Sequence, residues 1–207
     1  MKLSKGKKLL ILGIALVIID QVIKFLVKTN MTLGEQFNVI GTWFRILFVE
    51  NEGMAFGMKF GGSVGKFLLS LFRIVLCGLL VWWISSLNKK KDTPAGVLVG
   101  LTLITAGAVG NILDCLFYGL IFSASGWNEV AVLGGHYAPF MFGRVVDMFY
   151  FPIIDTTWPS WLPLIGGKAF TFFDPVFNFA DSCVTVGAFY LLLFQYKFFA
   201  KSEKEKK

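Results

Sequence analysis

The chain has 207 residues, of which 56% are hydrophobic and 16% aromatic, and its mean hydropathy is +0.69. So apolar a composition leaves too little polar surface for a soluble globular protein, and it indicates an integral membrane protein. The formal net charge is +7 at pH 7. Because the lysines lie beside apolar segments, we interpret this charge as a topology signal directed at anionic lipid headgroups, and we expect no nucleic-acid partner.

Four apolar segments are long enough to cross a bilayer as helices of about 20 residues. They cover roughly residues 9–27, 67–87, 96–116 and 177–199. We therefore predict an α-helical integral membrane protein with four transmembrane helices, formed by a single membrane domain over residues 1–207. No small-residue cleavage site follows the first apolar run, so we expect it to remain as a helix and not to be removed as a secretory signal.

Lysines mark one side of the predicted helices. They precede the first helix, join the second to the third and follow the fourth: Lys2, Lys5, Lys7, Lys8, Lys89, Lys90, Lys91, Lys197, Lys201, Lys204, Lys206 and Lys207. Positive charge near helix ends stays in the cytoplasm. Both termini are therefore expected there, with residues 28–66 and 117–176 on the outer side.

The two outer segments differ in pattern. Residues 44–49 form a short run of aromatic and branched residues, followed by a glycine-containing stretch at 51–57, which predicts a small β element at the membrane surface. The segment at 117–176 is longer than a connector needs to be and is irregular in composition, with several tryptophans and prolines. We predict that it forms a long ordered outer loop with little regular structure.

Polar residues inside the apolar segments follow helical spacing, so each pair shares a helix face. The pairs are Asp20 with Lys24, Asn111 with Asp114, and Asn178 with Asp181. If these faces point inward near the outer leaflet, they surround a polar pocket. The purely structural alternatives are an ion pair that neutralises itself for the first pair and hydrogen bonds between helices for the second pair.

Two aspartates, Asp147 and Asp181, are harder to explain structurally. No lysine or arginine lies one helical turn from Asp181, and Arg144 is the close basic residue beside Asp147. Carboxylates near hydrocarbon are costly and by default mark a functional site. Two that approach each other share a proton, so one can act as base on a water and the other as acid toward a carbonyl oxygen, as in soluble aspartic proteases. Either Asp174 or Asn178 can cap the helix that carries Asp181.

Other functions fit less well. A metal site needs more ligands than one histidine and scattered acids at unrelated spacings, and the chain has no His-Glu-x-x-His motif, so we expect neither metal nor cofactor. A proton-coupled transporter remains the alternative, since intramembrane aspartates also build proton relays. Against it, both aspartates lie at one edge of the membrane and no inverted repeat is visible. A non-enzymatic membrane scaffold held by polar pairs is the third possibility.

Five short motifs in order give the chain a resemblance to a known family. They are Asp20-Gln21-x-x-Lys24, Asn51-x-Gly53-x-Ala55-Phe56, Gly107-Ala108-x-Gly110-Asn111-x-x-Asp114, Gly143-x-Val145-Val146-Asp147 and Phe177-Asn178-x-Ala180-Asp181. Each is weak alone. Together, on a four-helix topology with both ends inside, they make the chain resemble the bacterial lipoprotein signal peptidases, or signal peptidase II.

The resemblance implies an aspartyl endopeptidase of the bacterial cytoplasmic membrane. Such an enzyme removes the signal peptide from diacylglyceryl-modified prolipoproteins by cutting before the lipidated cysteine, with its active site near the outer leaflet. It also implies that Asp147 and Asp181 are catalytic. Residues implied to bind substrate or support the site are Asn51, Gly53, Asn111, Asp114, Asn178, Ala180, Asp20 and Lys24. Its partners would be prolipoproteins and membrane lipids, and we expect a monomer.

The chain departs from the family pattern in two ways. The family usually has an arginine directly after the aspartate matching Asp114, whereas this chain has Cys115. We interpret Arg144 or Arg73 as a substitute for it. The stretches at 117–142 and 151–173 are also longer than the usual connectors, and insertions of this kind can form a lid over the site.

Overall fold

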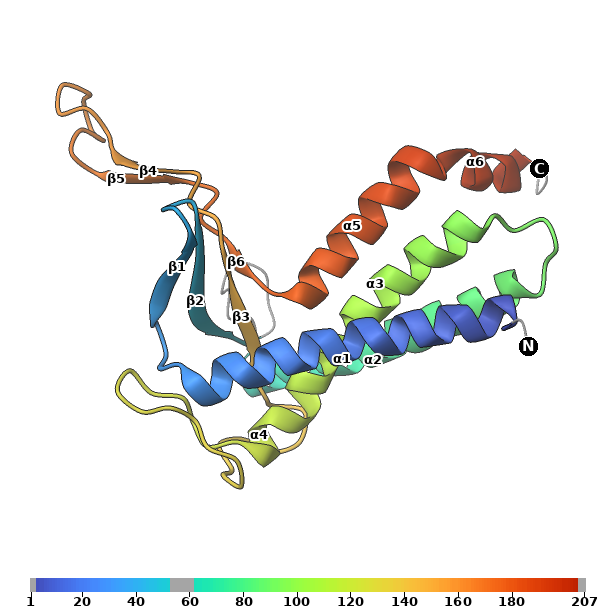
Figure 1. Cartoon of the computed structure of the whole chain (residues 1–207), viewed down its shortest axis with the longest axis horizontal. Helices are drawn as coiled ribbons and strands as arrows, with labels where there is room; N and C mark the ends of the chain where they lie inside the picture. Colours follow the sequence, from blue (N-terminus) through green and yellow to red (C-terminus); the bar gives the residue numbers. More distant parts are fainter. Residues whose placement is uncertain (1–2, 53–61, 205–207) are drawn as a thin grey trace.

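The structure, a computed structural model, describes residues 3–52 and 62–204. Three of its helical stretches are long and apolar enough to cross a membrane: α1 (Lys5–Asn30), α2 (Gly62–Asn88) and the continuous stretch Ala95–Ile121 (Figure 1). The last consists of α3 (Ala95–Leu113), a π-helical turn η2 (Asp114–Tyr118) and the short α4 (Gly119–Ile121). The prediction of a helical membrane protein is therefore confirmed.

The last predicted helix differs in detail from the expected segment at 177–199. It begins at Phe179 as α5 (Phe179–Phe194), is interrupted at Gln195, and continues as α6 (Tyr196–Lys204). With 16 residues, α5 spans about 24 Å at 1.5 Å per residue, which is less than the roughly 30 Å hydrocarbon thickness. A fourth crossing by this helix stays a prediction.

Helix α3 is the centre of the bundle, because α1, α2 and α5 all pack against it. Glycines allow the closest of these approaches, as is common where membrane helices meet. A Cβ on Gly107 would lie 2.2 Å from the carbonyl oxygen of Ala180, and one on Gly100 would lie 2.6 Å from the Cδ2 atom of Leu191. The α3–α5 contact therefore excludes side chains at these positions and fixes α5 close to α3.

An antiparallel sheet lies at one end of the bundle, with the strand order β1-β2-β3-β6 (Figure 1). The strands are β1 (Gln36–Ile40), β2 (Phe44–Asn51), β3 (Val145–Tyr150) and β6 (Val176–Phe177). A separate hairpin of β4 (Ile154–Thr157) and β5 (Ala169–Phe172) projects from the sheet as an arm. The expectation of little regular structure in residues 117–176 is wrong, because this segment contributes β3 to β6.

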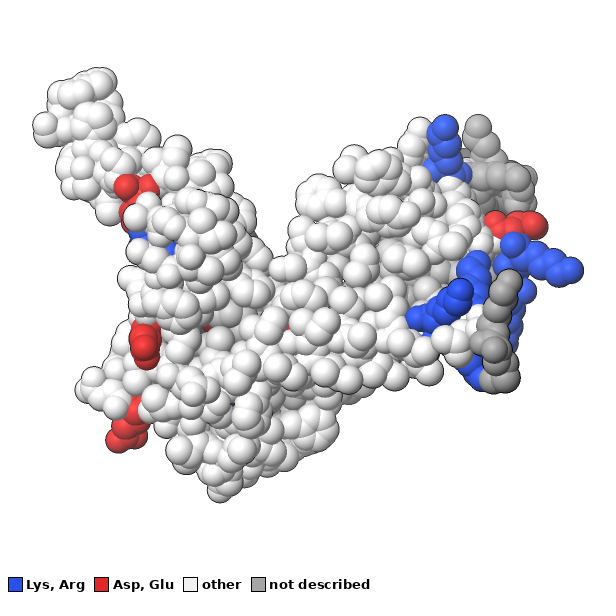
Figure 2. Space-filling view, viewed as in Figure 1, with Lys and Arg blue, Asp and Glu red and all other residues white. Residues whose placement is uncertain are grey.

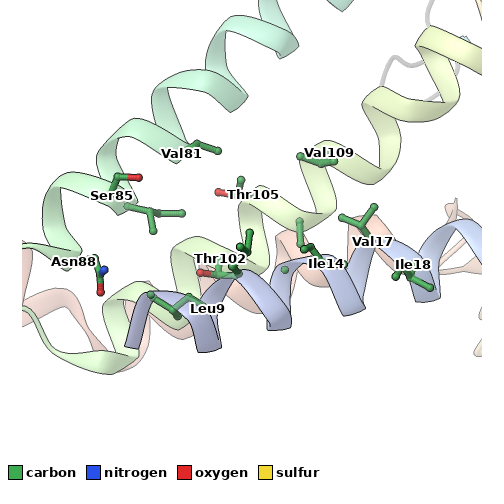
Figure 3. Close-up of a pocket in the computed structure, with 15 residues that line it drawn as sticks. Leu9, Ile14, Val17, Ile18, Val81, Ser85, Asn88, Thr102, Thr105 and Val109 are labelled. Atoms are coloured by element: carbon green, nitrogen blue, oxygen red, sulfur yellow. The ribbon is translucent and has the colours of Figure 1, made fainter. Parts of the chain in front are cut away.

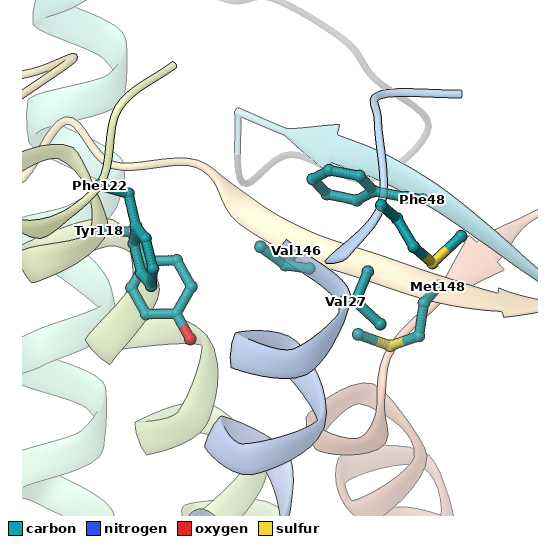
Figure 4. Packing of buried hydrophobic residues seen from close by; sticks show 7 residues of the cluster. Val27, Phe48, Tyr118, Phe122, Val146 and Met148 are labelled. Atoms are coloured by element: carbon teal, nitrogen blue, oxygen red, sulfur yellow. The ribbon is translucent and has the colours of Figure 1, made fainter. Parts of the chain in front are cut away.

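Local pattern indicated a β element at residues 44–49, which lie in β2, but it could not reveal the central pairing of the sheet, which joins β2 to β3, about one hundred residues apart in the chain. A hydrophobic cluster fastens the sheet to the helices: Val27, Met31, Phe48, Tyr118, Phe122, Val146 and Met148 (Figure 4). These residues come from the end of α1, from β2 and β3, and from the region of η2 and α4. Burial of such side chains is worth about 1.5–3 kcal/mol each, so the sheet and the helix ends form one packed unit.

Candidate active site

The two predicted catalytic aspartates come from different layers of the fold. Asp147 lies on β3, paired with Val49 of β2, and its exposed fraction is 4%. Asp181 lies in the first turn of α5. Asn178 is the N-cap of that helix, so the open choice between Asp174 and Asn178 is decided in favour of Asn178. Asn178 Oδ1 accepts a hydrogen bond from the backbone amide of Asp181 at 2.9 Å. Asp181 Oδ2 accepts one from the backbone amide of Asn178 at 3.3 Å, which completes a capping box.

Two asparagine side chains connect the aspartates. Asn178 Nδ2 donates to Asp147 Oδ1 at 2.7 Å and to Asn111 Oδ1 at 3.0 Å. Asn111 Nδ2 in turn donates to Asp181 Oδ1 at 2.8 Å. From the sheet, Asn51 Nδ2 donates to Asp147 Oδ2 at 3.3 Å. The structure therefore brings together all three asparagines that the sequence placed at the site.

The environments of the two carboxylates are unequal. Asp147 is buried, whereas Asp181 is partly exposed. Burial raises the pKa of Asp147 to about 7, and the nearby charge of Asp181 acts in the same direction, while the amides of Asn178 and Asn51 oppose the shift. Such a raised pKa in a site with a second carboxylate is typical of acid–base catalysis.

Lys24 is the centre of a buried ionic cluster beneath these residues. Its Nζ atom lies 3.0 Å from Asp20 Oδ2 and 2.8 Å from Asp114 Oδ2, and it donates to Asn111 Oδ1 at 2.9 Å. The expected Asp20–Lys24 ion pair is therefore present. The pair is not isolated, because the carboxylate of Asp114, from the third predicted helix, also binds Lys24.

Asp20 and Asp114 each hold the backbone next to one of the two candidate catalytic residues. Asp20 Oδ1 accepts from the amide of Ala180, which precedes Asp181, at 2.9 Å. Asp114 Oδ2 accepts from the amide of Val146, which precedes Asp147, at 3.3 Å. Since one lysine binds both acids, a single cluster on α1 and η2 fixes the strand and the helix that carry the site. The π-helical turn at Asp114 is of the kind often found at functional sites.

The sequence analysis missed two members of this cluster, Gln21 and Tyr118. Gln21 Nε2 donates to Asp114 Oδ1 at 2.9 Å, to Asp20 Oδ2 at 3.1 Å and to the carbonyl oxygen of Gly110 at 3.1 Å. Tyr118 donates its hydroxyl to Gln21 Oε1 at 3.2 Å. The signal for Gln21 was its place inside the first motif. Tyr118 had no signal, because it reaches the site through the π-helical turn.

Arg144 does not reach the aspartates. Its Nη1 and Nε atoms lie 3.2 Å from Glu50 Oε2 and 3.1 Å from Glu52 Oε1, the two residues on either side of Asn51. These carboxylates raise the pKa of Arg144 against the opposing effect of burial. The same Glu50 pairs with Lys28 at the end of α1. Arg144 therefore supports the strand that carries Asn51.

Arg73, on α2, donates from Nη1 to Cys115 Sγ at 3.7 Å, so its guanidinium lies beside the position where the family pattern has an arginine. Gly53, which the resemblance also implies, lies outside the described residues. Within residues 3–52 and 62–204, no group of three His, Cys, Asp or Glu side chains is arranged to hold a metal ion.

Comparison with known proteins decides the family. Residues 12–197 match the family model for signal peptidase (SPase) II. A lipoprotein signal peptidase of Porphyromonas gingivalis is 50% identical over 195 residues, which cover 93% of this chain and 84% of the relative. The chain belongs to the signal peptidase II family. A lipoprotein signal peptidase of Amoebophilus asiaticus is 36% identical over 191 residues, covering 87% of this chain and 75% of the relative.

The fold of this family member is also similar to solved structures. A bacterial membrane enzyme determined by the in meso method at 2.3 Å resolution superposes with a TM-score of 0.61 over 92% of this chain and 88% of that one, at 24% identity. A second, at 1.9 Å resolution, gives 0.59 over 90% and 91%. The family model and the relative from Porphyromonas gingivalis confirm, as family membership, the resemblance inferred from five short motifs.

Proposed function

We propose that this signal peptidase II is an intramembrane aspartic endopeptidase in which Asp147 and Asp181 together hydrolyse the peptide bond before the diacylglyceryl-modified cysteine of a prolipoprotein. Family membership supports the reaction and the substrate class. The observation that carries the assignment of residues is the bridge that Asn178 and Asn111 make between a buried and a partly exposed carboxylate. No metal or cofactor enters the proposed reaction, because the two acids activate water themselves.

The geometry supports a division of roles. Asp147, whose pKa is raised to about 7, holds the shared proton and gives it to the scissile carbonyl oxygen. Asp181 accepts hydrogen bonds on both oxygens and lies at a helix N-terminus, which stabilises negative charge there. It removes a proton from the attacking water. Because the pair shares one proton, the assignment describes the reactive state of a coupled dyad.

The remaining residues have positioning roles in this proposal. Asn111, Asn178 and Asn51 orient the carboxylates and bind the substrate backbone. Lys24, together with Asp20 and Asp114, holds β3 and α5 in position. Asp20 contributes by accepting a hydrogen bond from the backbone amide of Ala180. Gly53 keeps the supporting role that the family pattern implies.

We further propose a single four-span domain, a monomer surrounded by membrane lipid, with both termini in the cytoplasm of a bacterial cell. Lysines gather at the end of the molecule where the two termini lie, on the face that Figure 2 shows, while the sheet, whose strand β3 carries Asp147, lies toward the other end (Figures 1 and 2). Such an asymmetry supports a cytoplasmic lysine-rich end and an active site near the outer leaflet. A lipid-modified substrate presents its scissile bond at that surface.

The test is a gel-shift assay of a purified diacylglyceryl-modified prolipoprotein. Asp147→Asn and Asp181→Asn should each lower the cleavage rate by about 10²–10⁴, the range for loss of a general acid or base. Asp155→Asn is the matched control, since Asp155 lies on the projecting arm, where it pairs with Arg45. Near-wild-type cleavage by either dyad variant would disprove the assignment.

A further inference from the structure

A cavity of about 410 Å³ lies between α1, α2 and α3, away from the aspartates (Figure 3). Both α1 and α2 pack against α3 but touch each other little, so a groove remains between them. Its wall on α1 runs from Gly6 to Ile18, and its wall on α2 from Val81 to Asn88. It therefore begins at the lysine-rich end of the molecule and extends toward the middle of the bundle.

The interior of the groove is apolar. Thr102 and Thr105, on the α3 wall, donate their hydroxyls back to the carbonyl oxygens of Leu98 and Leu101, so these polar groups are satisfied within the helix. The other residues of the α1 and α3 walls are aliphatic or glycine. Such a lining suits a hydrocarbon ligand.

The dimensions select an acyl chain over a helix. From Gly6 to Ile18 the α1 wall is about 18 Å long at 1.5 Å per residue, close to the roughly 15 Å of one hydrocarbon leaflet. A helix about 10 Å wide would occupy roughly 1,400 Å³ over that length, well above the 410 Å³ of the cavity. The space therefore suits a narrower occupant such as an acyl chain.

The mouth of the groove differs chemically from its interior. Asn88 and Ser85 line it, and Asn88 Oδ1 has no hydrogen-bond donor among the described residues. A turn of this side-chain amide into the mouth would let a headgroup hydroxyl donate to it. Exposed lysines surround the same end: Lys7 and Lys8 on α1, and Lys89, Lys90 and Lys91 after α2. A negatively charged, hydroxyl-bearing headgroup is complementary to this combination.

We propose that this groove binds one anionic phospholipid of the lysine-side leaflet, with an acyl chain between α1 and α2 and a hydroxyl-bearing phosphate headgroup at Asn88 and the lysines. The lipid would fill the space between α1 and α2, which contact each other little, and would pack against α3 as well. This site is separate from the aspartates and from any substrate bound there.

The test uses phosphatidylglycerol with a photoreactive diazirine on one acyl chain, added to the full-length protein in mixed micelles and mapped by peptide mass spectrometry. Crosslinks should concentrate on residues 6–18 and 81–88. Unlabelled phosphatidylglycerol should displace the probe at least fivefold more effectively than phosphatidylcholine with the same chains. Glycerol phosphate, the soluble headgroup alone, should not displace it.

Variants separate this site from general lipid contact. Gly13→Leu and Val17→Phe place carbon atoms in the groove and should lower the crosslinking of residues 6–18 at least fivefold. A Cβ on Gly13 would meet its nearest neighbour, Thr102 Cγ2, at 3.5 Å, so the helix packing tolerates it. Ile11→Phe, at an exposed position outside the groove, should change nothing. Melting temperatures of all variants check folding.

The contribution of the lysines is measured separately, as the preference for phosphatidylglycerol over phosphatidylcholine. The double variant Lys8→Gln with Lys91→Gln should retain crosslinking but lose the preference for phosphatidylglycerol over phosphatidylcholine. Equal displacement by the two lipids in the wild type, or wild-type crosslinking in folded Gly13→Leu, would overturn the proposal. A groove that crosslinks no more than the exposed α2 surface around Phe72, which lies outside the groove, would overturn it as well.

Discussion

Asp147 sets the pH range in which the proposed acid can act. Its pKa is raised to about 7 by burial and by the charge of Asp181, so the residue is protonated below that pH and loses its proton above it. A general acid must carry a proton, and kcat/KM should therefore fall as the pH rises through about 7. A pH–rate profile on the lipid-modified substrate measures this alkaline limb, whose midpoint belongs to the dyad as a pair.

Asn51 offers a check on the same pKa. Its side-chain amide donates to Asp147 Oδ2 and opposes the upward shift of the pKa. In Asn51→Ala the pKa of Asp147 should rise further, and the alkaline limb should move to higher pH whatever happens to the maximal rate. A limb that stays in place, or that moves to lower pH, would show that it reports another group.

Loss of the Lys24 side chain should lower stability strongly. Lys24→Met leaves Asp20 and Asp114 buried without their cation, and breaking a buried pair in this way costs about 3–5 kcal/mol. Thermal melting in detergent measures the loss, with Lys168→Met at an exposed position as the control. Adding Asp20→Asn and Asp114→Asn to Lys24→Met should recover part of the melting temperature, because neutral amides need no counter-charge. A fully stable single variant would contradict the buried cluster.

At the scale of elements, the close contact of α3 with α5 controls where Asp181 lies. A Cβ on Gly107 would overlap the carbonyl oxygen of Ala180 at 2.2 Å, so Gly107→Ala must push the first turn of α5 away from α3. We expect a lower melting temperature and at least a tenfold loss of cleavage. Gly78→Ala, on α2 with nothing within 4 Å of the added atom, is the matched control and should be neutral or slightly stabilising through helix propensity. Equal effects of the two substitutions would show that the contact does not govern the site.

The elements also show what sequence could and could not reveal. Hydropathy predicted the helices because a membrane span is a local property of about 20 residues. Helical spacing found the polar pairs for the same reason. It could not find that Asp114 shares Lys24, since that contact depends on how α1 packs against the third helix. The β2–β3 pairing, the π-helical turn and the hydrogen bond from Val146 to Asp114 are likewise products of tertiary packing.

At the scale of the whole molecule, the ionic cluster explains how a small bundle holds two residues from unrelated elements together. One lysine on α1 binds the acid that anchors α5 and the acid that anchors β3. The strand pairs with β2, and β2 is held in turn by Arg144 through Glu50 and Glu52. The site therefore needs both the membrane helices and the sheet, which agrees with a substrate whose scissile bond lies where the two layers meet.

The proposed topology places the helices in the membrane and the sheet at its outer surface. Cysteine labelling in intact cells tests this orientation. In a background with Cys77, Cys115 and Cys183 replaced by alanine, Trp161→Cys on the outer arm should react with a membrane-impermeant maleimide added outside. Lys90→Cys, in the α2–α3 turn, should react only after the membrane is permeabilised. Lysine-rich connections stay in the cytoplasm, and an even number of crossings returns the C-terminus to that side. Labelling of position 90 in intact cells, or protection of position 161, would contradict the proposed orientation. The dyad would then lie near the cytoplasmic leaflet, where a translocated prolipoprotein could not present its cleavage site.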